Sequence, residues 1–150
     1  MRLEPISYRM ARASDWSAIR ALLQANKLPT DGAEAHLANF IVAESSDELT
    51  GCIGLEQFGE TGLLRSCAVA AEWRGSGVGG ALVQQLIQHA RQRGLHELVL
   101  LTTTASDYFP RFGFAQFPRS DAAQALLASA EFQGACPASA VAMRQTLQPA

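Results

Sequence analysis

The chain has 150 residues, of which 48% are hydrophobic and 17% are charged. This length predicts one domain, residues 1–150, with enough apolar residues to form a core. Twelve basic residues against 14 acidic ones leave a formal charge of −2, which argues against nucleic acid or an anionic membrane as a partner. No apolar run approaches the roughly 18 residues of a membrane span, and the N-terminus lacks the apolar stretch of a signal peptide.

Cysteine and histidine usage predicts neither a disulfide framework nor a metal centre. The three cysteines, Cys52, Cys67 and Cys136, are scattered, and the three histidines share no ligand spacing with them or with one another. Cys52 and Cys67 stand in apolar runs typical of strands, where a free cysteine behaves as a small hydrophobic residue. We therefore expect a reducing, cytoplasmic compartment and no bound metal.

Hydrophobic periodicity predicts strands and helices along the whole chain. Up to residue 70 it predicts a short strand at 8–12, a helix from 14 that ends before Pro29, a weaker helix at 31–38, and strands at 40–43, 50–58 and 63–70. Beyond it we expect a helix at 77–93, a buried strand at 98–101, a short helix from 105, a strand at 114–117, a helix at 121–131 and a last strand at 140–147. Hairpins come first and one crossover helix lies between two strands, so the order favours a mixed α/β sheet over a doubly wound one.

The junction before the long predicted helix is rich in glycine. It contains Gly75, Gly77, Gly79 and Gly80. Glycines let the backbone adopt positive φ and approach a ligand without obstruction by a Cβ atom. Free N–H groups at a helix start, together with the helix dipole, favour an anion such as a pyrophosphate. Arg74 would add a charge-assisted contact to that anion.

Other interpretations of the glycine-rich junction are available. It could be a tight turn that binds nothing, although four glycines at a helix start carry a cost in conformational entropy. The spacing Gly75-x-Gly77-x-x-Gly80 also fits the dinucleotide pattern GxGxxG, but no βαβ unit with an acidic residue about 20 residues further on is clear. A loop of the GxxxxGK[ST] type is excluded, because no Lys-Ser or Lys-Thr pair follows the glycines.

The turn at residues 59–62 brings two charged residues to opposite strands. If Gly59 faces Gly62, Glu56 lies opposite Arg65 on the same face of the sheet. One interpretation is a cross-strand ion pair with a structural role. The other is a substrate site, in which Glu56 binds an ammonium group or acts as a base through water and Arg65 binds a carboxylate with two hydrogen bonds.

Three passages of the chain resemble the GNAT family of N-acetyltransferases. RGSGVG at 74–79 matches its R/Q-x-x-G-x-G/A motif, LRSCAVA at 64–70 resembles its central strand, and FGF at 112–114 resembles its x-G-F signature. The order of elements is similar over residues 8–147. The resemblance implies an acyltransferase with the GNAT acyl-CoA N-acyltransferase fold, of the α/β (α+β) class. Its central sheet would be mixed, mostly antiparallel, of about seven strands and flanked by helices.

By this resemblance the chain binds acetyl-CoA as a cosubstrate and needs no metal. The pyrophosphate would rest on the glycine-rich loop. The pantetheine would pair with the exposed edge of the central strand, where a backbone N–H would hold the thioester oxygen. The residues that the resemblance implies for cofactor binding are Cys67, Ala68, Val69, Arg74, Gly75, Ser76, Gly77, Val78, Gly79 and Gly80.

Candidates for proton transfer and acceptor binding follow from the same resemblance. Many family members place a tyrosine four residues before the glycine of the x-G-F signature, to protonate the departing thiolate. Phe109 occupies that position, and Tyr108 stands one step earlier, either as an acid or as a packing residue. A thiolate can also leave unassisted, since the pKa of a thiol is about 8.5. Thr102 ends a buried strand, where it would bind the substrate or serve only as a strand former.

The acceptor that the resemblance implies is an acidic amino acid. The passages LPT at 28–30, GLE at 54–56 with LRS at 64–66, and LTTTA at 101–105 resemble bacterial proteins associated with arsenic resistance. Such proteins would acetylate the amino group of a glutamate-like amino acid that carries an arsenic or phosphorus acid. The stretch RSCAV at 65–69 also resembles the corresponding strand of short N-acetylglutamate synthases. Arg65 would bind such an acceptor during direct transfer in a ternary complex.

A different class of function also fits the sequence. A catalytically silent, regulatory module would keep the loop that binds acyl-CoA and lack the acid, as Phe109 suggests. In either case we expect a small-molecule amine as the partner, with no nucleic acid and no membrane. Family members are often homodimers, so we also expect a homodimer.

Overall fold

The computed structural model describes residues 5–148, so both ends of the predicted domain 1–150 and most of the N-terminal segment examined for a signal peptide lie outside the described residues. The chain divides into two compact units. Unit 1 holds the described chain up to Gly54, together with Ser66–Leu86. Unit 2 holds Leu55–Arg65 and the described chain from Ile87 onward. That the chain forms one domain stays a prediction.

Within residues 5–148, seven strands form one hydrogen-bonded sheet, in the order β1-β2-β3-β4-β5-β7-β6. Their bounds are β1 Ser7–Met10, β2 Phe40–Ser45, β3 Glu48–Phe58, β4 Thr61–Val69, β5 Glu97–Thr102, β6 Ala115–Gln116 and β7 Val141–Thr146. β4 and β5 run parallel, whereas β1–β2, β2–β3, β5–β7 and β6–β7 are antiparallel. The predicted mixed and mostly antiparallel sheet is therefore confirmed.

In the described part of the chain, two α-helices and several short helical turns accompany the strands. The α-helices are α1 Trp16–Ala25 and α2 Val78–Gln92, and no helix within residues 5–148 is long and apolar enough to cross a membrane. The 3₁₀ turns are η1 Ala13–Asp15, η2 Glu34–Asn39, η3 Ala71–Trp73, η4 Phe109–Phe112, η5 Arg119–Asp121 and η6 Gln124–Ala128, and η7 Glu131–Ala135 is a π turn.

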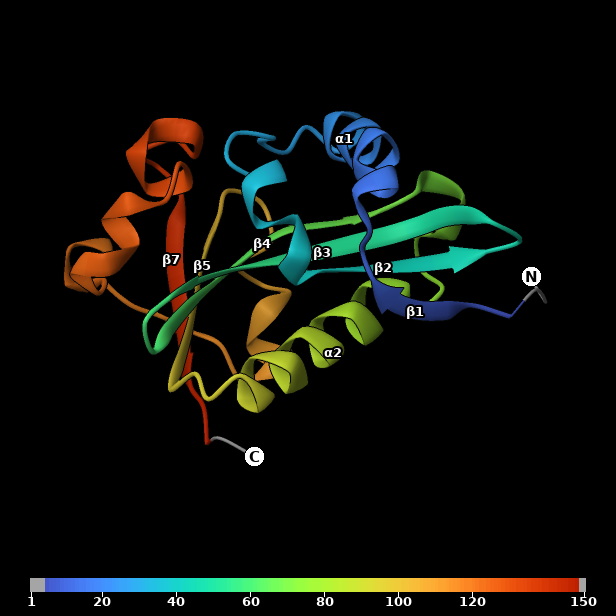
Figure 1. Cartoon of the computed structure of the whole chain (residues 1–150). Coiled ribbons are helices and arrows are strands. Elements are labelled where there is room, and N and C mark those ends of the chain that lie inside the picture. The colour runs from blue at the N-terminus through green and yellow to red at the C-terminus, as the bar shows by residue number, and fades with distance from the viewer. Residues whose placement is uncertain (1–4, 149–150) are drawn as a thin grey trace. The chain divides into compact units, whose positions relative to one another are not determined.

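In unit 1, helices cover both faces of the strands (Figure 1). Ile19 and Leu23 of α1 are fully buried in a cluster with Cys52 of β3. The neighbouring residue of β3, Gly51, faces the start of α2, because successive residues of a strand point to opposite faces. A Cβ atom on Gly51 would lie 2.9 Å from Cδ1 of Leu82, so only glycine lets α2 pack this closely on the sheet.

In unit 2, a second cluster joins β4 and β5 to the turns that precede β7. Leu63 of β4, Val99 of β5 and Leu126 of η6 are fully buried together, and Phe117 and Phe132 pack against them. The turns lie beside β7 in Figure 1, where they are drawn in orange. This packing holds the segment between β6 and β7 in place without a long helix.

The predicted helix at 121–131 is wrong, and the reason lies in that cluster. Ala122 and Ala123 adopt extended backbone angles between η5 and η6. The break lets both alanines contact the same cluster as Leu126, and tertiary packing thus outweighs the helix propensity of an alanine-rich segment. The helices predicted at 31–38 and from 105 are likewise replaced by turns that include η2 and η4.

The hairpin between β3 and β4 turns more tightly than its sequence suggested. Only Gly59 and Glu60 join the two strands, and Gly59 has the positive φ, +63°, that glycine supplies at the first position of a type II′ turn. Gly62, assigned to the turn above, belongs to β4. A Cβ atom there would lie 2.7 Å from side chains of Leu55 and Leu95, so this glycine serves close packing rather than the turn.

Candidate functional site

The glycine-rich loop lies in unit 1, between η3 and α2. Gly75 and Gly77 have positive φ values of 80° and 91°, as their position in the loop predicted. Gly79 and Gly80 lie inside the first turn of α2 and have no positive φ, so that expectation is wrong for these two. A Cβ atom on Gly75 or Gly77 would have nothing within 4 Å, so backbone conformation rather than crowding requires glycine there.

Internal hydrogen bonds fix the shape of the loop. The carbonyl of Trp73, a buried residue, accepts hydrogen bonds from both the backbone N–H and the hydroxyl of Ser76. The N–H of Ala81 donates to the carbonyl of Gly77 over 3.1 Å, which starts the hydrogen-bond ladder of α2. The N–H groups that precede this bond have no partner within the helix, and the positive end of its dipole lies with them.

Arg74 and Asn26 form a contact that the sequence did not predict. Arg74 is exposed, and its Nη2 donates to Oδ1 of Asn26 over 2.9 Å. The Nδ2 of Asn26 donates to the carbonyls of Leu22, at 2.9 Å, and Val69, at 3.4 Å. One amide therefore joins the end of α1, the end of β4 and the cationic side chain of the loop. Its only signal in the sequence is an asparagine directly after a helical stripe, where residues that end helices are common.

The end of β4 leads from the sheet to this loop. Ser66, in the middle of the strand, has a φ of +61°, which residues other than glycine rarely adopt. Its carbonyl accepts a hydrogen bond from Sγ of Cys52 at 3.4 Å.

Burial raises the pKa of the Cys67 thiol to about 12. Because the thiolate is the nucleophilic form, Cys67 is a poor nucleophile at neutral pH.

A buried charge cluster lies in unit 2. Arg65 Nη1 lies 2.6 Å from Oε2 of Glu56, and Arg65 Nε lies 3.4 Å from Oε2 of Glu131. The side chains of Arg65, Glu56 and Glu131 are 0%, 1% and 4% exposed. The predicted contact between Glu56 and Arg65 is thus confirmed, whereas sequence reasoning missed Glu131.

Glu131 and Cys136 extend the cluster. Desolvation raises the pKa of Glu131, and the nearby charge of Glu56 adds to this effect, while the charge of Arg65 opposes it. The pKa of the Cys136 thiol is raised to about 12, first by desolvation and then by the charge of Glu131 and a hydrogen bond to it. The positive charges of Arg65 and Arg119 both lower the pKa of this thiol and so oppose that rise.

The remaining candidates also lie in unit 2. The ring of Tyr108, directly before η4, packs edge-on against Phe109 and Phe112, with centroids 5.4 and 5.2 Å away, and the guanidinium of Arg111 lies 4.6 Å from its centroid. Phe109 is buried, where its ring packs against that of Phe114. Catalysis by the Tyr108 hydroxyl stays a prediction.

Thr102 closes a turn at the end of β5. Its Oγ1 accepts a hydrogen bond from the N–H of Ala105 over 2.9 Å, a contact that is common where such a residue ends a strand. Substrate binding by Thr102 stays a prediction. In the described part of the chain, no three His, Cys, Asp or Glu side chains come together as a metal site.

Comparison with known proteins places the chain in a family. The sequence profile of the Acetyltransferase (GNAT) family matches residues 8–114, and the chain therefore belongs to this family. The amino-acid acetyltransferase of Neisseria meningitidis serogroup A is 29% identical over 120 residues, which are 73% of this chain and 27% of that protein. The chain thus spans about a quarter of the length of this curated relative.

Two solved structures have a similar fold. N-acetylglutamate synthase from Neisseria gonorrhoeae, complexed with coenzyme A and N-acetyl-glutamate, superposes with a TM-score of 0.82 at 22% identity, over 98% of this chain and 36% of that one. Rv2747 from Mycobacterium tuberculosis, in complex with CoA, superposes with a TM-score of 0.78 at 24% identity, over 94% of this chain and 99% of that one. These likenesses show that the chain has the GNAT fold.

Proposed function

We propose that this chain transfers the acetyl group of acetyl-CoA to the amino group of a small amino acid. The observation that carries the proposal is the loop with two positive-φ glycines directly before α2, a helix of 15 residues. Its free N–H groups and helix dipole suit a pyrophosphate. The names of the relatives, amino-acid acetyltransferase and N-acetylglutamate synthase, support an amino acid as the acceptor.

The residues of unit 1 fit the two ends of acetyl-CoA, which would supply the acetyl thioester. The loop residues 75–80 would bind the pyrophosphate through backbone N–H groups, and Arg74 would add a charge-assisted hydrogen bond. The backbone of Cys67, Ala68 and Val69 would bind the pantetheine arm. Asn26 supports both parts, since it contacts Arg74 and the carbonyl of Val69.

The cysteines favour direct transfer in a ternary complex. The pKa values of the Cys67 and Cys136 thiols are raised to about 12 by burial, and burial also raises that of Cys52. Thiols of this kind are almost fully protonated at neutral pH and cannot readily take up an acetyl group. The acceptor amine would therefore attack the thioester carbon itself, so that a C–N bond forms and the C–S bond breaks.

Each proton in this reaction has a proposed destination. Glu56 would receive the proton that the amine loses, through water, and Tyr108 would donate a proton to the departing thiolate. Arg65 would bind an acceptor carboxylate in place of Glu131, whose contact with the guanidinium is longer than that of Glu56. The pKa of the Glu131 carboxyl is also raised by desolvation, which makes it easier to protonate than an ordinary glutamate. Thr102 would add a hydroxyl contact to the acceptor.

The acceptor that we propose is glutamate or a glutamate-like amino acid bearing an arsenic or phosphorus acid. The test is thiol release from acetyl-CoA with glutamate, its phosphinic and arsonic analogues, glutamine and neutral amino acids. We expect turnover with the acidic acceptors, and glutamate as the best one would indicate activity like that of an N-acetylglutamate synthase. Saturable acetyl-CoA binding without turnover of any acceptor would instead support a silent regulatory module, which the burial of Phe109 in the tyrosine position favours.

We propose two further properties of the protein, its cellular compartment and its oligomeric state. The three cysteines are free, which supports a reducing, cytoplasmic compartment. We also propose a homodimer, and sedimentation of the purified protein at several concentrations tests it directly.

A further inference from the structure

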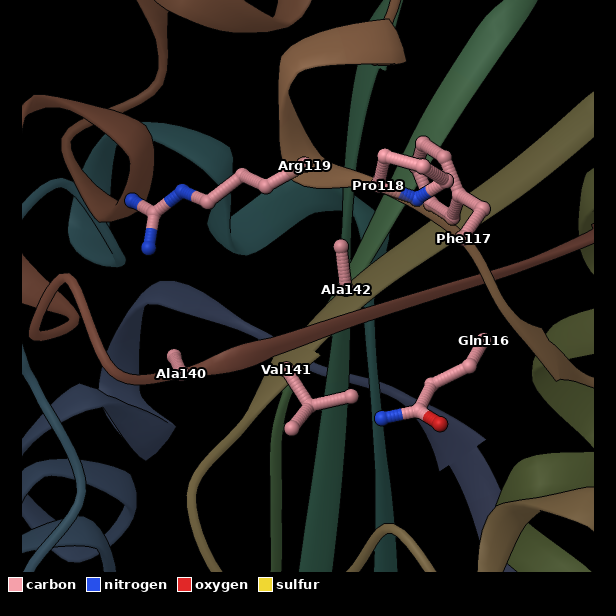
Figure 2. Close-up of a pocket in the computed structure, with 7 residues that line it drawn as sticks. All are labelled: Gln116, Phe117, Pro118, Arg119, Ala140, Val141 and Ala142. Atoms are coloured by element: carbon pink, nitrogen blue, oxygen red, sulfur yellow. The ribbon is translucent and has the colours of Figure 1, made fainter.

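Unit 2 contains a pocket that none of the candidate residues above lines. It is open to solvent, has a volume of about 390 Å³, and lies between residues 116–119 and residues 140–142 (Figure 2). This volume is near the lower end of the range for small-molecule sites, roughly 300–1,000 Å³. Its walls are apolar except for two side chains, those of Gln116 and Arg119. The pocket therefore offers room for a small ligand and one charged group to orient it.

The guanidinium of Arg119 has contacts that hold it in place, but most of its N–H donors have no acceptor among the described residues. Its Nη1 donates to the carbonyl of Pro137 over 3.0 Å, and its Cζ lies 5.3 Å from the centroid of Phe132. Within residues 5–148 no carboxylate pairs with it. A guanidinium has five N–H donors in a planar fork that matches a carboxylate. Most of these donors thus remain for a ligand, in contrast to the fully buried Arg65.

The floor of the pocket connects it with the end of β5. Val141 and Ala142 pair with Thr102 and Leu101 in the antiparallel β5–β7 ladder. Thr102 is one of the residues proposed above to contact the acceptor. A ligand in the pocket would therefore bind one strand away from the proposed acceptor site.

We propose that this pocket binds a carboxylate of the amino-acid acceptor through Arg119. The inference rests on the proposed function and adds the second basic residue that an acceptor with two acidic groups requires. Arg119 donates to the carbonyl of Pro137, and Arg65 lies 3.4 Å from the carboxylate of Glu131, so both guanidiniums contact the short segment 131–137.

The test is the dependence of acceptor KM on Arg119. Arg119→Gln should raise the KM for glutamate at least tenfold, a loss of about 1.4 kcal/mol, and leave the KM for acetyl-CoA unchanged. The KM for glutamate of Arg119→Lys should lie between those of the wild type and Arg119→Gln, because lysine keeps the charge but lacks the planar fork of donors. Arg91→Gln is the matched control, since Arg91 also donates one hydrogen bond to a backbone carbonyl, that of Gln148, and lies outside the pocket.

Amide analogues of the acceptor show which carboxylate binds and keep the test independent of folding. We expect glutamine or the α-amide of glutamate to have a raised KM with the wild-type enzyme and no further rise with Arg119→Gln. An unchanged glutamate KM in both Arg119 variants would overturn the inference and leave the proposed function standing. If no amino acid is acetylated, calorimetry with glutamate decides: binding that Arg119→Gln abolishes supports the pocket without the activity, and binding that is absent or unchanged refutes it.

Discussion

Arg65 donates a 2.6 Å hydrogen bond to Glu56 across the β3–β4 hairpin, and neither side chain is more than 1% exposed. Charges this deeply buried lose their hydration, and their attraction repays that loss only when the pair is intact. Glu131 approaches the same guanidinium from the segment before β7. The cluster thus joins a hairpin to a distant part of unit 2 and makes each of its members costly to remove alone.

Arg65→Met should destabilise the protein strongly. It leaves Glu56 and Glu131 as buried carboxylates without their cation, and removing one partner of a buried pair typically costs about 3–5 kcal/mol. Urea unfolding followed by circular dichroism measures the change. Glu44→Gln is the control, because Glu44 pairs with Arg9 at a partly exposed site where water screens the charges, and it should have a far smaller effect. Equal effects of the two variants would contradict the argument.

The sequence predicted two of the three charged members of this cluster, Glu56 and Arg65. The turn has two residues instead of the expected four, which shifts the register by two and places Arg65 diagonally across from Glu56 rather than directly opposite. Both residues still point to the same face of the sheet, and the long arginine side chain reaches the carboxylate. Glu131 could not be found in this way. It lies far from Arg65 in the sequence, after an apparently helical segment that extended residues at Ala122 and Ala123 interrupt.

The glycine-rich loop likewise has features that the sequence predicted and a contact that it did not. Glycines at a helix start predicted positive φ at Gly75 and Gly77, since local backbone chemistry decides that conformation. Asn26 was missed because its contacts with Val69 and Arg74 depend on how α1 lies on the sheet. Local signals therefore predict the strands, the long helix and the loop, whereas contacts between distant segments can be identified only from the tertiary structure.

Glu131 should make stability fall as the pH rises. Desolvation raises its pKa in the folded protein, so above the ordinary pKa of a glutamate the unfolded chain releases this proton before the folded chain does. The folded state then binds more protons, and its stability decreases until the pH has passed the raised pKa. Glu131→Gln should remove this decrease, and urea unfolding between about pH 5 and 8, the range in which most proteins are most stable, measures it.

Asp15 provides the control of opposite sign. Its hydrogen bond to Arg9 lowers its pKa, so the stability that it contributes is present above the unfolded pKa and is lost as the pH falls through the folded one. Asp15→Asn should flatten the acid side of the curve, which is measured by extending the urea series below about pH 4, the ordinary pKa of an aspartate. If Glu131→Gln also changes only the acid side, the raised pKa of Glu131 is not what governs stability.

Gly77→Ala should weaken acetyl-CoA binding. At a φ of +91° an alanine is strained by about 1–2 kcal/mol, and relief of that strain would turn the loop N–H groups away from the pyrophosphate. Gly59→Ala is matched to it, since Gly59 also has a positive φ and open space around its Cα. Both variants should lose similar stability in urea, while only Gly77→Ala should raise the KM for acetyl-CoA. A normal KM in Gly77→Ala would remove this loop from the binding site.

Asn26→Ala should raise the KM for acetyl-CoA about fivefold, which corresponds to one ordinary hydrogen bond. The substitution frees Arg74 from its 2.9 Å contact and so loosens the cation that would bind the pyrophosphate. In the double variant with Arg74→Ala, loss of Asn26 should add little, because the two residues act together. Additive effects would show that Asn26 acts on stability alone, through Leu22 and Val69.

Tyr108→Phe separates chemistry from packing. It keeps the ring that packs against Phe109 and Phe112 and removes only the hydroxyl. If that hydroxyl protonates the thiolate, kcat should fall about tenfold or more while both KM values stay unchanged. Tyr108→Leu, which also removes the ring, should lower the thermal midpoint as well. A full kcat in Tyr108→Phe would assign the residue to packing, and the thiolate would then leave without an acid, as the low pKa of a thiol, about 8.5, permits.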